Sequence, residues 1–394
     1  MKDTILFGDC KETLSAFLPQ SARTCVTSPP YYGLRDYGTA TWIGGDPNCN
    51  HRRDSKVKPE NCNTGHKNHD EMSGVGDAIY KTVCPKCGAI RQDSQIGLEE
   101  SPEEYVESLV SVFREVRNIL TDDGTLWVNL GDSYYNYRSD GNYPKQSVSK
   151  TRQDLPMSTP VRGNKLQGYK SKDLIGIPWL FAFAMRADGW YLRQDIIWHK
   201  PNPMPESVRD RCTKSHEYIF LFSKNKKYFY DNEAIKEPAK DWGTRDRTNG
   251  KYHNTGTGLA PHSGLSKSYP TKNKRSVWSV TVKPYKEAHF ATYPPDLIEP
   301  CILAGSEEGD TILDPFMGAG TTAAVAKSLN RYYIGCELNE DYGNLIQKRI
   351  QDYQPVNKVA QEPCINILDI ISVSYTHLRA HETREDLVCR LLLE

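Results

Sequence analysis

The feature that most constrains the fold is an alternation of short apolar runs with longer amphipathic segments. The apolar runs are rich in β-branched and aromatic residues, which is typical of strands buried inside a sheet. They lie at Thr4–Phe7, Thr24–Thr27, Thr125–Leu130, Tyr191–Trp198, Tyr218–Ser223, Thr311–Phe316 and Tyr332–Leu338. Strands that alternate with helices predict an α/β protein with a doubly wound, mostly parallel sheet, and we expect seven strands.

The clearest helical pattern begins at Ser101 and continues to Leu120. Ser101 is suited to cap the N-terminus, Pro102 fits the first helical position, and two glutamates follow in the first turn. Apolar residues then recur at helical spacing, at Val106, Leu109, Val110, Phe113 and Val116. The helix is expected to end before a turn at Asp122–Gly124, which leads into the next strand.

The charges of the chain are balanced in number but not in distribution. The 394 residues include 50 Lys or Arg and 50 Asp or Glu, yet residues 138–173 contain 8 basic against 3 acidic side chains, and residues 199–286 contain 18 against 8. Two basic stretches on an otherwise acidic chain favour a surface that faces a polyanion.

Several function classes are disfavoured by the sequence. No run of about 18 apolar residues is present, which argues against a transmembrane helix and a membrane partner. The N-terminus lacks the cationic and apolar pattern of a secretory signal. Eleven cysteines without such a signal indicate a reducing compartment, so we expect a cytoplasmic protein without a disulfide scaffold.

A glycine-containing loop, DPFMGAGT at residues 314–321, follows one predicted strand and precedes a helix. Gly318 and Gly320 let the backbone pass close to a ligand at the carboxyl end of the strand, where doubly wound sheets bind cofactors. The helix N-terminus can receive a carboxylate such as that of a methionyl group. Glu337 ends the next strand, a position from which an acid typically binds ribose hydroxyls. These neighbours favour S-adenosylmethionine binding over the alternative of an ordinary tight turn.

A second loop, Ser28-Pro29-Pro30-Tyr31, also directly follows a predicted strand. The prolines make the loop stiff and remove amide donors, so that the carbonyls and the Ser28 hydroxyl can point outward as acceptors. Such a loop can accept both hydrogens of an amino group while the Tyr31 ring stacks on the attached planar base. A proline turn with a surface tyrosine is the alternative, and the presence of the glycine loop argues against it.

Together the two loops resemble the motifs of the β arrangement of DNA amino-methyltransferases, in which Ser-Pro-Pro-Tyr precedes Asp-Pro-Phe-x-Gly-x-Gly. The resemblance extends from Ile5 to about Ile350. Protein glutamine methyltransferases place a similar Pro-Pro-Tyr loop after the glycine loop, so the order favours DNA, with RNA as an open alternative. The resemblance implies a permuted S-adenosylmethionine-dependent methyltransferase fold, encoded by a bacterium or a phage.

The resemblance also implies roles for individual residues. The catalytic residues would be Ser28, Pro29, Pro30 and Tyr31. The cofactor-binding residues would be Asp9, Asp314, Phe316, Gly318, Gly320, Thr321, Glu337 and Phe290. For Asp9, Phe290 and Tyr293, a role in packing or capping is an equal alternative.

The implied reaction is direct methyl transfer to an exocyclic amine of a base flipped out of double-stranded DNA. Serine before Pro-Pro-Tyr favours N4 of cytosine, with N6 of adenine as the alternative. Carbon-5 methylation of cytosine needs a Pro-Cys nucleophile, and Pro300-Cys301 lies in a predicted apolar helix instead. A DNA-binding module with an inactive site is a hypothesis of another class, and a restriction endonuclease acting on the same site is a candidate partner.

Cys49-x-His51 and Cys84-x-x-Cys87-Gly are spaced as metal ligands. A Cys-x-x-Cys-Gly knuckle directs two thiolates at one metal, and Cys49 with His51 would complete a tetrahedral site. Since methyl transfer needs no metal, we expect a structural zinc ion, with free surface cysteines as the alternative. Other candidate ligands in the same stretch are Cys62, His66 and His69.

The domain organisation follows from these assignments. The methyltransferase core is expected at 1–38, 98–137, 174–235 and 286–353, interrupted by a zinc-ribbon-like insertion at 39–97 and basic loops at 138–173 and 236–285, and followed by an extension at 354–373. The basic loops would read the target, and the candidate DNA contacts are Lys200, Lys272, Lys274 and Arg275. Residues 374–394 resemble a translated adapter or vector read-through, and we expect them to be foreign to the fold.

Overall fold

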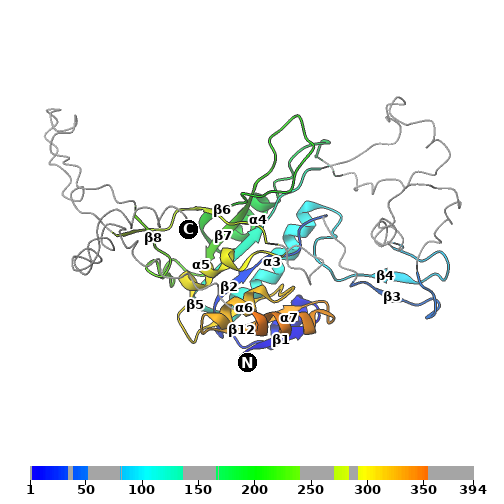
Figure 1. The fold of residues 1–394 in the computed structure, drawn as a ribbon. Coiled ribbons are helices and arrows are strands. Elements are labelled where there is room, and N and C mark those ends of the chain that lie inside the picture. Colours follow the sequence, from blue (N-terminus) through cyan, green and yellow to red (C-terminus); the bar gives the residue numbers. More distant parts are fainter. Residues whose placement is uncertain are drawn as a thin grey trace, which may run out of the picture. The chain divides into compact units, whose positions relative to one another are not determined.

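A computed structural model describes residues 2–33, 39–51, 80, 82–135, 166, 168–239, 270–283 and 292–353 of the chain (Figure 1). Residues 1–353 form one unit. The predictions for the extension and tail at 354–394 lie outside the described residues, as do Phe290 and most of the two basic loops.

An eight-stranded sheet forms the centre of this unit, with the strand order β1-β12-β11-β2-β5-β7-β6-β10. Its strands are β1 Thr4–Phe7, β2 Ala22–Thr27, β5 Leu120–Leu130, β6 Tyr191–His199, β7 His216–Ser223, β10 Val277–Ser279, β11 Thr311–Asp314 and β12 Tyr332–Glu337. Strand β7 is antiparallel to both of its neighbours, and the other neighbouring pairs are parallel. The prediction of a mostly parallel α/β sheet is confirmed.

Two details of the predicted sheet are wrong. The sheet has eight strands rather than seven, because β10 pairs in parallel with the last three residues of β6. Strand β10 lies in a polar, basic stretch. Its Trp278 side chain is buried and donates a hydrogen bond from Nε1 to the Arg275 carbonyl at 2.7 Å, which anchors the strand. The turn expected at Asp122–Gly124 is part of β5 instead, opposite an irregular register between Ala22 and Thr24.

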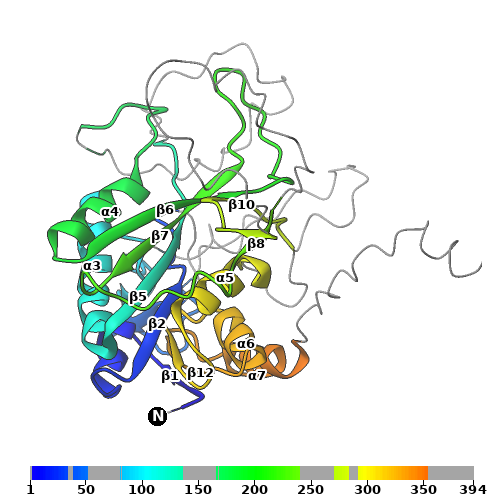
Figure 2. The same ribbon diagram turned by 90° about the vertical axis from the view of Figure 1, so that its left-hand side faces the viewer.

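Helices cover both faces of the sheet (Figure 2). On one face lie α1 Cys10–Thr13, the 3-10 turn η1 Leu14–Ala16, α3 Pro102–Ile119 and α4 Ile177–Ala187, whose buried residues share one apolar core. On the other lie α5 Pro295–Gly305, α6 Thr321–Ser328 and α7 Tyr342–Asp352, with a second core. Among the described residues, no helix is long and apolar enough to cross a membrane.

Helix α3 begins as its sequence predicts. The Ser101 hydroxyl accepts a hydrogen bond from the Glu104 amide at 3.2 Å, and the Glu104 carboxylate accepts one from the Ser101 amide at 3.3 Å, which completes a capping box. The helix buries Phe113 and Val116 completely against the sheet. Two short ribbons lie outside the main sheet: β3 Thr41–Ile43 with β4 Ile90–Gln92, and β8 Glu237–Pro238 with β9 Thr271–Lys272.

The strand directions bring the functional loops to one edge of the sheet. The parallel strands β1, β2, β5, β6, β11 and β12 all end there, and the antiparallel β7 begins there. In open α/β sheets ligands bind outside the carboxyl ends of the strands, so this edge is where a site is expected.

Candidate active site

A cavity of about 780 Å³ lies at this edge of the sheet and connects the two loops singled out by the sequence. Its wall includes Ser28, Pro29, Pro30 and Tyr31 from the proline loop after β2. It also includes Asp9, Phe316, Gly318, Thr321 and Glu337 from the ends of β1, β11 and β12. The volume is within the range of small-molecule and cofactor sites.

The proline loop is fixed from behind by neighbouring residues. The Pro30 carbonyl accepts a hydrogen bond from the Tyr105 hydroxyl of α3 at 2.8 Å. The Ser28 hydroxyl lies 3.5 Å from Asn129 Oδ1 at the end of β5. Within the described part of the chain, no hydrogen bond reaches the Pro29 carbonyl. Ser28 and Pro29 both line the cavity, so the Ser28 hydroxyl and the Pro29 carbonyl are the candidate acceptors of this loop.

The Tyr31 side chain is anchored at both its hydroxyl and its ring. The hydroxyl lies 2.8 Å from Glu217 Oε2 and 3.1 Å from Asn129 Oδ1, and donates to this pair of acceptors. A Cβ on Gly131 would come within 2.5 Å of the ring, so only glycine fits beside it. Burial and the Glu217 carboxylate raise the pKa of Tyr31 well above its usual value, which keeps the phenol neutral.

A carboxylate and two lysines complete this side of the cavity. Glu217 Oε1 accepts from Lys200 Nζ, which also lies 4.2 Å from the centre of the Trp198 ring. Lys214 Nζ donates to the Asp132 carbonyl at 2.6 Å, and burial lowers the pKa of Lys214. Lys200, predicted as a DNA contact, therefore lies in the cavity wall and is paired with a carboxylate.

Asn129 and Glu217 were not predicted as site residues. Both are polar residues inside otherwise apolar strands, the runs 125–130 and 216–223. A polar side chain at the end of a buried strand is a usable signal for a site at the carboxyl edge of a sheet. That signal alone does not identify which side chain Tyr31 contacts, since the two strands are paired only in the folded sheet.

Asp314 supports the glycine loop from beneath the cavity. Its fully buried carboxylate accepts from Thr27 Oγ1 at 2.5 Å, Thr322 Oγ1 at 2.6 Å, the Phe316 amide at 3.0 Å and the Tyr293 hydroxyl at 3.1 Å. Burial raises the pKa of Asp314 in spite of these donors. The residue joins β2, β11 and α6 and is not among the residues that line the cavity, and its role in cofactor binding stays a prediction.

The glycine loop joins Glu337 through its backbone. The Gly318 amide donates to Glu337 Oε2 at 2.7 Å, and the Asn339 amide donates to Oε1 at 2.9 Å. Burial raises the pKa of Glu337 to about 7, although both amides act in the opposite direction. Gly320 has a φ of 80° and caps α6, and a Cβ there would come within 2.8 Å of Ile346, so this glycine serves packing against α7.

Asp9 caps a helix and also lies at the cavity, so its predicted cofactor contact stays a prediction. Its Oδ1 accepts from the Lys11 amide at 2.9 Å and caps α1, and the residue also lines the cavity. Phe316 lines the cavity as well, and its ring meets Phe113 edge-on at 6.4 Å. Tyr293 is partly buried, its hydroxyl bonds Thr322 and Asp314, and the residue also lines the cavity, so both of its predicted roles stay open.

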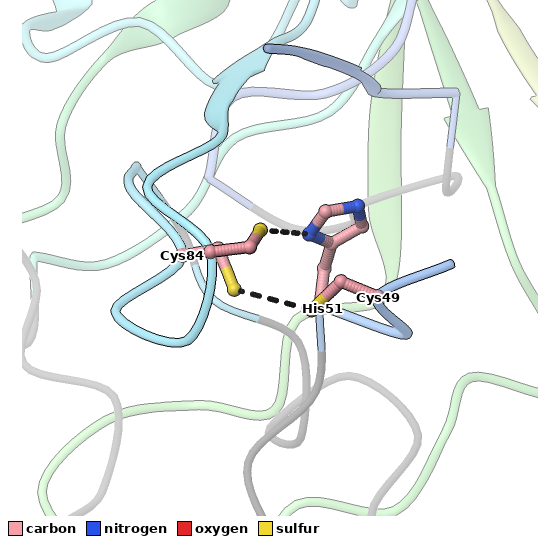
Figure 3. A group of neighbouring side chains, drawn as sticks. Cys49, His51 and Cys84 are labelled. Carbon is pink, nitrogen blue, oxygen red and sulfur yellow. Dashed lines mark hydrogen bonds between the residues drawn. The ribbon is translucent and has the colours of Figure 1, made fainter. Parts of the chain in front are cut away.

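The four predicted metal ligands come together in the ribbon formed by β3 and β4. One ligand atom from each of Cys49, His51, Cys84 and Cys87 lies within 4.8 Å of the others. The Sγ atoms of Cys49 and Cys84 lie 3.8 Å apart, and His51 Nδ1 lies 3.5 Å from Cys87 Sγ. Figure 3 shows Cys49, His51 and Cys84 pointing toward one another. We call this group the Cys/His cluster.

The spacing of the Cys/His cluster fits a tetrahedral zinc site. Bonds of about 2.3 Å to sulfur and about 2.0 Å to nitrogen at tetrahedral angles separate two sulfurs by about 3.8 Å and a sulfur from a nitrogen by about 3.5 Å. The Cys49–Cys84 and Cys87–His51 separations are 3.8 Å and 3.5 Å, and the remaining pairs of ligand atoms lie within 4.8 Å of one another. The Cys84 carbonyl accepts from the Gly88 amide at 2.7 Å, which forms the tight knuckle.

The remaining candidate DNA contacts lie beside the ribbon of β8 and β9. Lys272 and Lys274 approach the Glu237 carboxylate at 3.8 Å and 3.6 Å, and Lys274 lies 5.1 Å from the centre of the Trp278 ring. Arg275 precedes β10, and its carbonyl accepts from Trp278. The three cations are adjacent, and their role in binding DNA stays a prediction.

Comparison with known proteins places the chain in a family. The model of the DNA methylase family of N6- and N4-methyltransferases matches residues 22–348. The chain is 39% identical over 348 residues to the type II methyltransferase M.XycI of Xanthomonas campestris pv. cyanopsidis, with 88% of this chain and 87% of the relative covered. It is also 39% identical over 346 residues to the type II methyltransferase M.SmaI of Serratia marcescens, with 88% and 90% covered.

A solved structure shares the fold at low sequence identity. The cytosine-N4-specific PvuII DNA methyltransferase matches with a TM-score of 0.51 and 16% identity, covering 90% of this chain and 88% of its own. The family match and the two relatives agree with the cavity, in which a Ser-Pro-Pro-Tyr loop and a glycine loop meet at the carboxyl edge of a mostly parallel sheet. The chain belongs to the DNA methylase family of N6- and N4-methyltransferases.

Proposed function

We propose that this chain transfers a methyl group from S-adenosylmethionine to N4 of cytosine in a specific sequence of double-stranded DNA. The observation that supports this most strongly is the single cavity shared by the Ser28–Tyr31 loop and the Gly318 loop. A group-transfer enzyme needs donor and acceptor in one site at reacting distance, and a shared cavity supplies that proximity.

The glycine side of the cavity fits S-adenosylmethionine. Glu337 and Asp9 are the carboxylates suited to ribose hydroxyls and the adenine region, and Phe316 offers an apolar ring. The backbone at Gly318 leaves room for close approach, since nothing nearer than 3.9 Å would meet a Cβ there. When bound, the cofactor supplies a methyl group on a positively charged sulfur, which is the electrophile of the reaction.

The proline side of the cavity would prepare the acceptor amine. The lone pair of an exocyclic amine is delocalised into the base ring, which makes the nitrogen a poor nucleophile. Acceptance of its two hydrogens by the Ser28 hydroxyl and the Pro29 carbonyl favours a tetrahedral nitrogen with a localised lone pair. The nitrogen would then attack the methyl carbon in line as the carbon–sulfur bond breaks, and S-adenosylhomocysteine would leave with the bonding electron pair. The extra proton would pass from the nitrogen to solvent water after the new bond has formed. Positioning and local electrostatics supply most of the acceleration.

Tyr31 would hold the target base by stacking. Its ring borders the cavity and packs against Gly131, and its hydroxyl donates to Glu217 and Asn129. Because the reacting face of the amine is stacked in a duplex, the base has to leave the helix to reach this ring.

Serine at position 28 favours cytosine N4, and adenine N6 is the second candidate. Carbon-5 transfer is a poorer fit, because Cys301 is fully buried in α5 and burial raises the pKa of its thiol far above the usual value. A nucleophilic cysteine needs an accessible thiolate.

The test is methylation of mixed-sequence DNA by the purified protein, followed by digestion to nucleosides and mass spectrometry, with Tyr31→Ala as the control. N4-methylcytosine would support the proposal, and N6-methyladenine would keep the mechanism and overturn the base. No methylated nucleoside, together with no affinity for S-adenosylmethionine by calorimetry, would favour a DNA-binding protein without catalysis.

We further propose that the Cys/His cluster binds one structural zinc ion. Three thiolates and an imidazole form a closed ligand set, with no position left for a water or substrate. The metal would join the two strands of the β3/β4 ribbon and take no part in methyl transfer. Atomic emission of the purified protein should give about one zinc per chain.

The partners would be duplex DNA and, as in a restriction-modification pair, an endonuclease that cleaves the same sequence. Lys272, Lys274 and Arg275 are the proposed phosphate contacts, and their substitution should weaken binding similarly on all sequences. The relatives with 39% identity are bacterial, which supports action on DNA in a bacterial cytoplasm.

A further inference from the structure

The loop between β6 and β7 exposes an apolar side chain at the rim of the cavity. Met204 has 86% of its surface exposed, more than the other exposed large apolar side chains of the described residues. A single exposed apolar residue is ordinary on a protein surface, so exposure alone indicates no function. The position of Met204 at the cavity is the more informative observation. Pro203, Met204 and Pro205 together border the cavity that contains the Ser28–Tyr31 loop.

The loop that presents Met204 is braced at its base and along its length. Asn202 forms two hydrogen bonds with the Val282 backbone, at 3.1 Å and 3.0 Å. Farther along, Glu206 accepts from Arg211 at 2.6 Å, and the Arg211 guanidinium covers the Tyr134 ring at 3.9 Å. The prolines on both sides of Met204 restrict the backbone further. Figure 2 shows this loop projecting beyond the ends of β6 and β7.

The charge of the loop suits the surface of a nucleic acid. Residues 200–215 contain four Lys or Arg against two Asp or Glu. Arg209 is exposed five residues after Met204, whereas Lys214 is partly buried in the cavity wall. An exposed apolar side chain on a loop with excess positive charge is the combination found where a protein contacts phosphates and inserts a side chain between bases.

We propose that Met204 enters the DNA duplex and fills the space left by the target base when that base rotates into the cavity. The proposal rests on the proposed function, in which the base has to leave the helix. Apolar side chains, methionine among them, serve as wedges between base steps, and the unbranched thioether adapts to irregular gaps. Methionine cannot pair with the orphaned partner base, so it acts by occupying the stack rather than by reading sequence.

The test compares Met204→Ala with the wild type in single-turnover methylation of a synthetic duplex. The recognition sequence for the duplex is first read by single-molecule sequencing of a plasmid methylated by the wild-type protein. On the paired duplex we expect Met204→Ala to be slower by about tenfold or more, because the vacated space stays unfilled. On the same duplex with an abasic site opposite the target, the difference should shrink to within about threefold, since the target is then already unpaired.

Two further variants separate the wedge from a general effect. Met204→Leu should retain the rate within about threefold, because leucine is also an apolar wedge. Leu18→Ala removes another exposed apolar side chain, 68% exposed at the opposite edge of the sheet, and should change nothing. Melting temperature and affinity for S-adenosylmethionine should be equal in all four proteins.

The outcomes distinguish this proposal from the proposed function. Equal rates of Met204→Ala and wild type on the paired duplex would overturn the wedge alone. An equal loss on the paired and the abasic duplex would also overturn it, and would assign Met204 to ordinary DNA contact. Absence of any methylation by the wild type would overturn the proposed function and this proposal with it.

Discussion

The cavity and the Cys/His cluster are formed by different means. The residues of the cavity are fixed by the ends of long strands in an eight-stranded sheet, with an apolar core on each face. The residues of the Cys/His cluster lie in loops and a knuckle next to two three-residue strands, β3 and β4. We therefore expect the cavity to keep its shape without a ligand, whereas three thiolates within 4.8 Å of one another would repel one another without a cation.

The largest expected effect is the loss of zinc from Cys84→Ser. The substitution removes a fully buried ligand, and we expect zinc affinity to fall by a factor of about 1,000. Hydrogen exchange measured by mass spectrometry should accelerate in peptides covering 82–92 and stay unchanged in peptides covering 311–337. Cys212→Ser, at an exposed cysteine outside the cluster, is the matched control and should retain zinc. Faster exchange in both peptides would contradict this difference between the cluster and the cavity, because it would show that the central sheet also depends on the metal.

The next effect belongs to the cavity and should leave the metal untouched. Tyr31→Ala removes the stacking ring, and we expect methyl transfer to slow by about 100-fold while affinity for S-adenosylmethionine changes by less than about threefold. Tyr31→Phe keeps the ring and loses only the bonds to Glu217 and Asn129, so its rate should fall by about tenfold or less. Single-turnover kinetics measures both. An equal loss in the two variants would mean that the hydroxyl, rather than the ring, is the functional group.

A smaller effect is expected from pH, through Glu337. Its pKa is raised to about 7, and ribose hydroxyls prefer the ionised carboxylate as an acceptor. Affinity for S-adenosylmethionine by calorimetry should therefore be about tenfold higher at pH 8 than at pH 6, and Glu337→Gln should be weaker and independent of pH. A wild-type affinity that does not change over this range would remove Glu337 from the cofactor site.

The raised pKa of Glu337 also makes the stability of the fold depend on pH. The raised pKa means that the folded state binds the proton more tightly than the unfolded state, so stability is lost as pH rises from the ordinary value of 4.5 to about 7. Glu337→Gln should then raise the free energy of unfolding by about 2 kcal/mol at pH 8 and leave it unchanged at pH 4. Denaturant unfolding at the two pH values measures the difference, and a variant less stable at pH 8 would contradict it.

The sequence predicted the parts of the molecule that depend on local pattern. The seven apolar runs, the start of α3 at Ser101 and the meeting of the two loops all follow from periodicity, capping and the rule that parallel strands end at one edge. The Cys/His cluster followed from spacing, because the knuckle and its partners are short-range features. Strand β10 was not predicted, because three residues are too few to show the alternation of apolar and polar residues that indicates a strand.

The residues that the sequence did not predict depend on pairings between distant segments. Glu217 contacts Tyr31 only because β7 inserts between β5 and β6, an order that no local pattern determines. The donors to the Asp314 carboxylate were likewise not predicted, because they come from segments as far apart as Thr27 and Thr322. Met204 was not predicted, because its exposure is a property of the folded loop that the proline-rich sequence around it does not indicate.

The smallest expected effect compares two adjacent glycines in the ribbon. Gly44 and Gly45 both have a φ of 73°, so alanine strains the backbone equally at either position. A Cβ at Gly45 would come within 2.8 Å of Cys87 Sγ, whereas one at Gly44 would meet nothing within 4 Å. Gly45→Ala should weaken zinc binding about fivefold more than Gly44→Ala, as measured by competition with a chelating dye. Neither substitution should alter methyl transfer, unless the ribbon itself contacts DNA. Equal affinities would show that the ribbon adjusts around the metal, and that the metal rather than the short strands determines the geometry of the cluster.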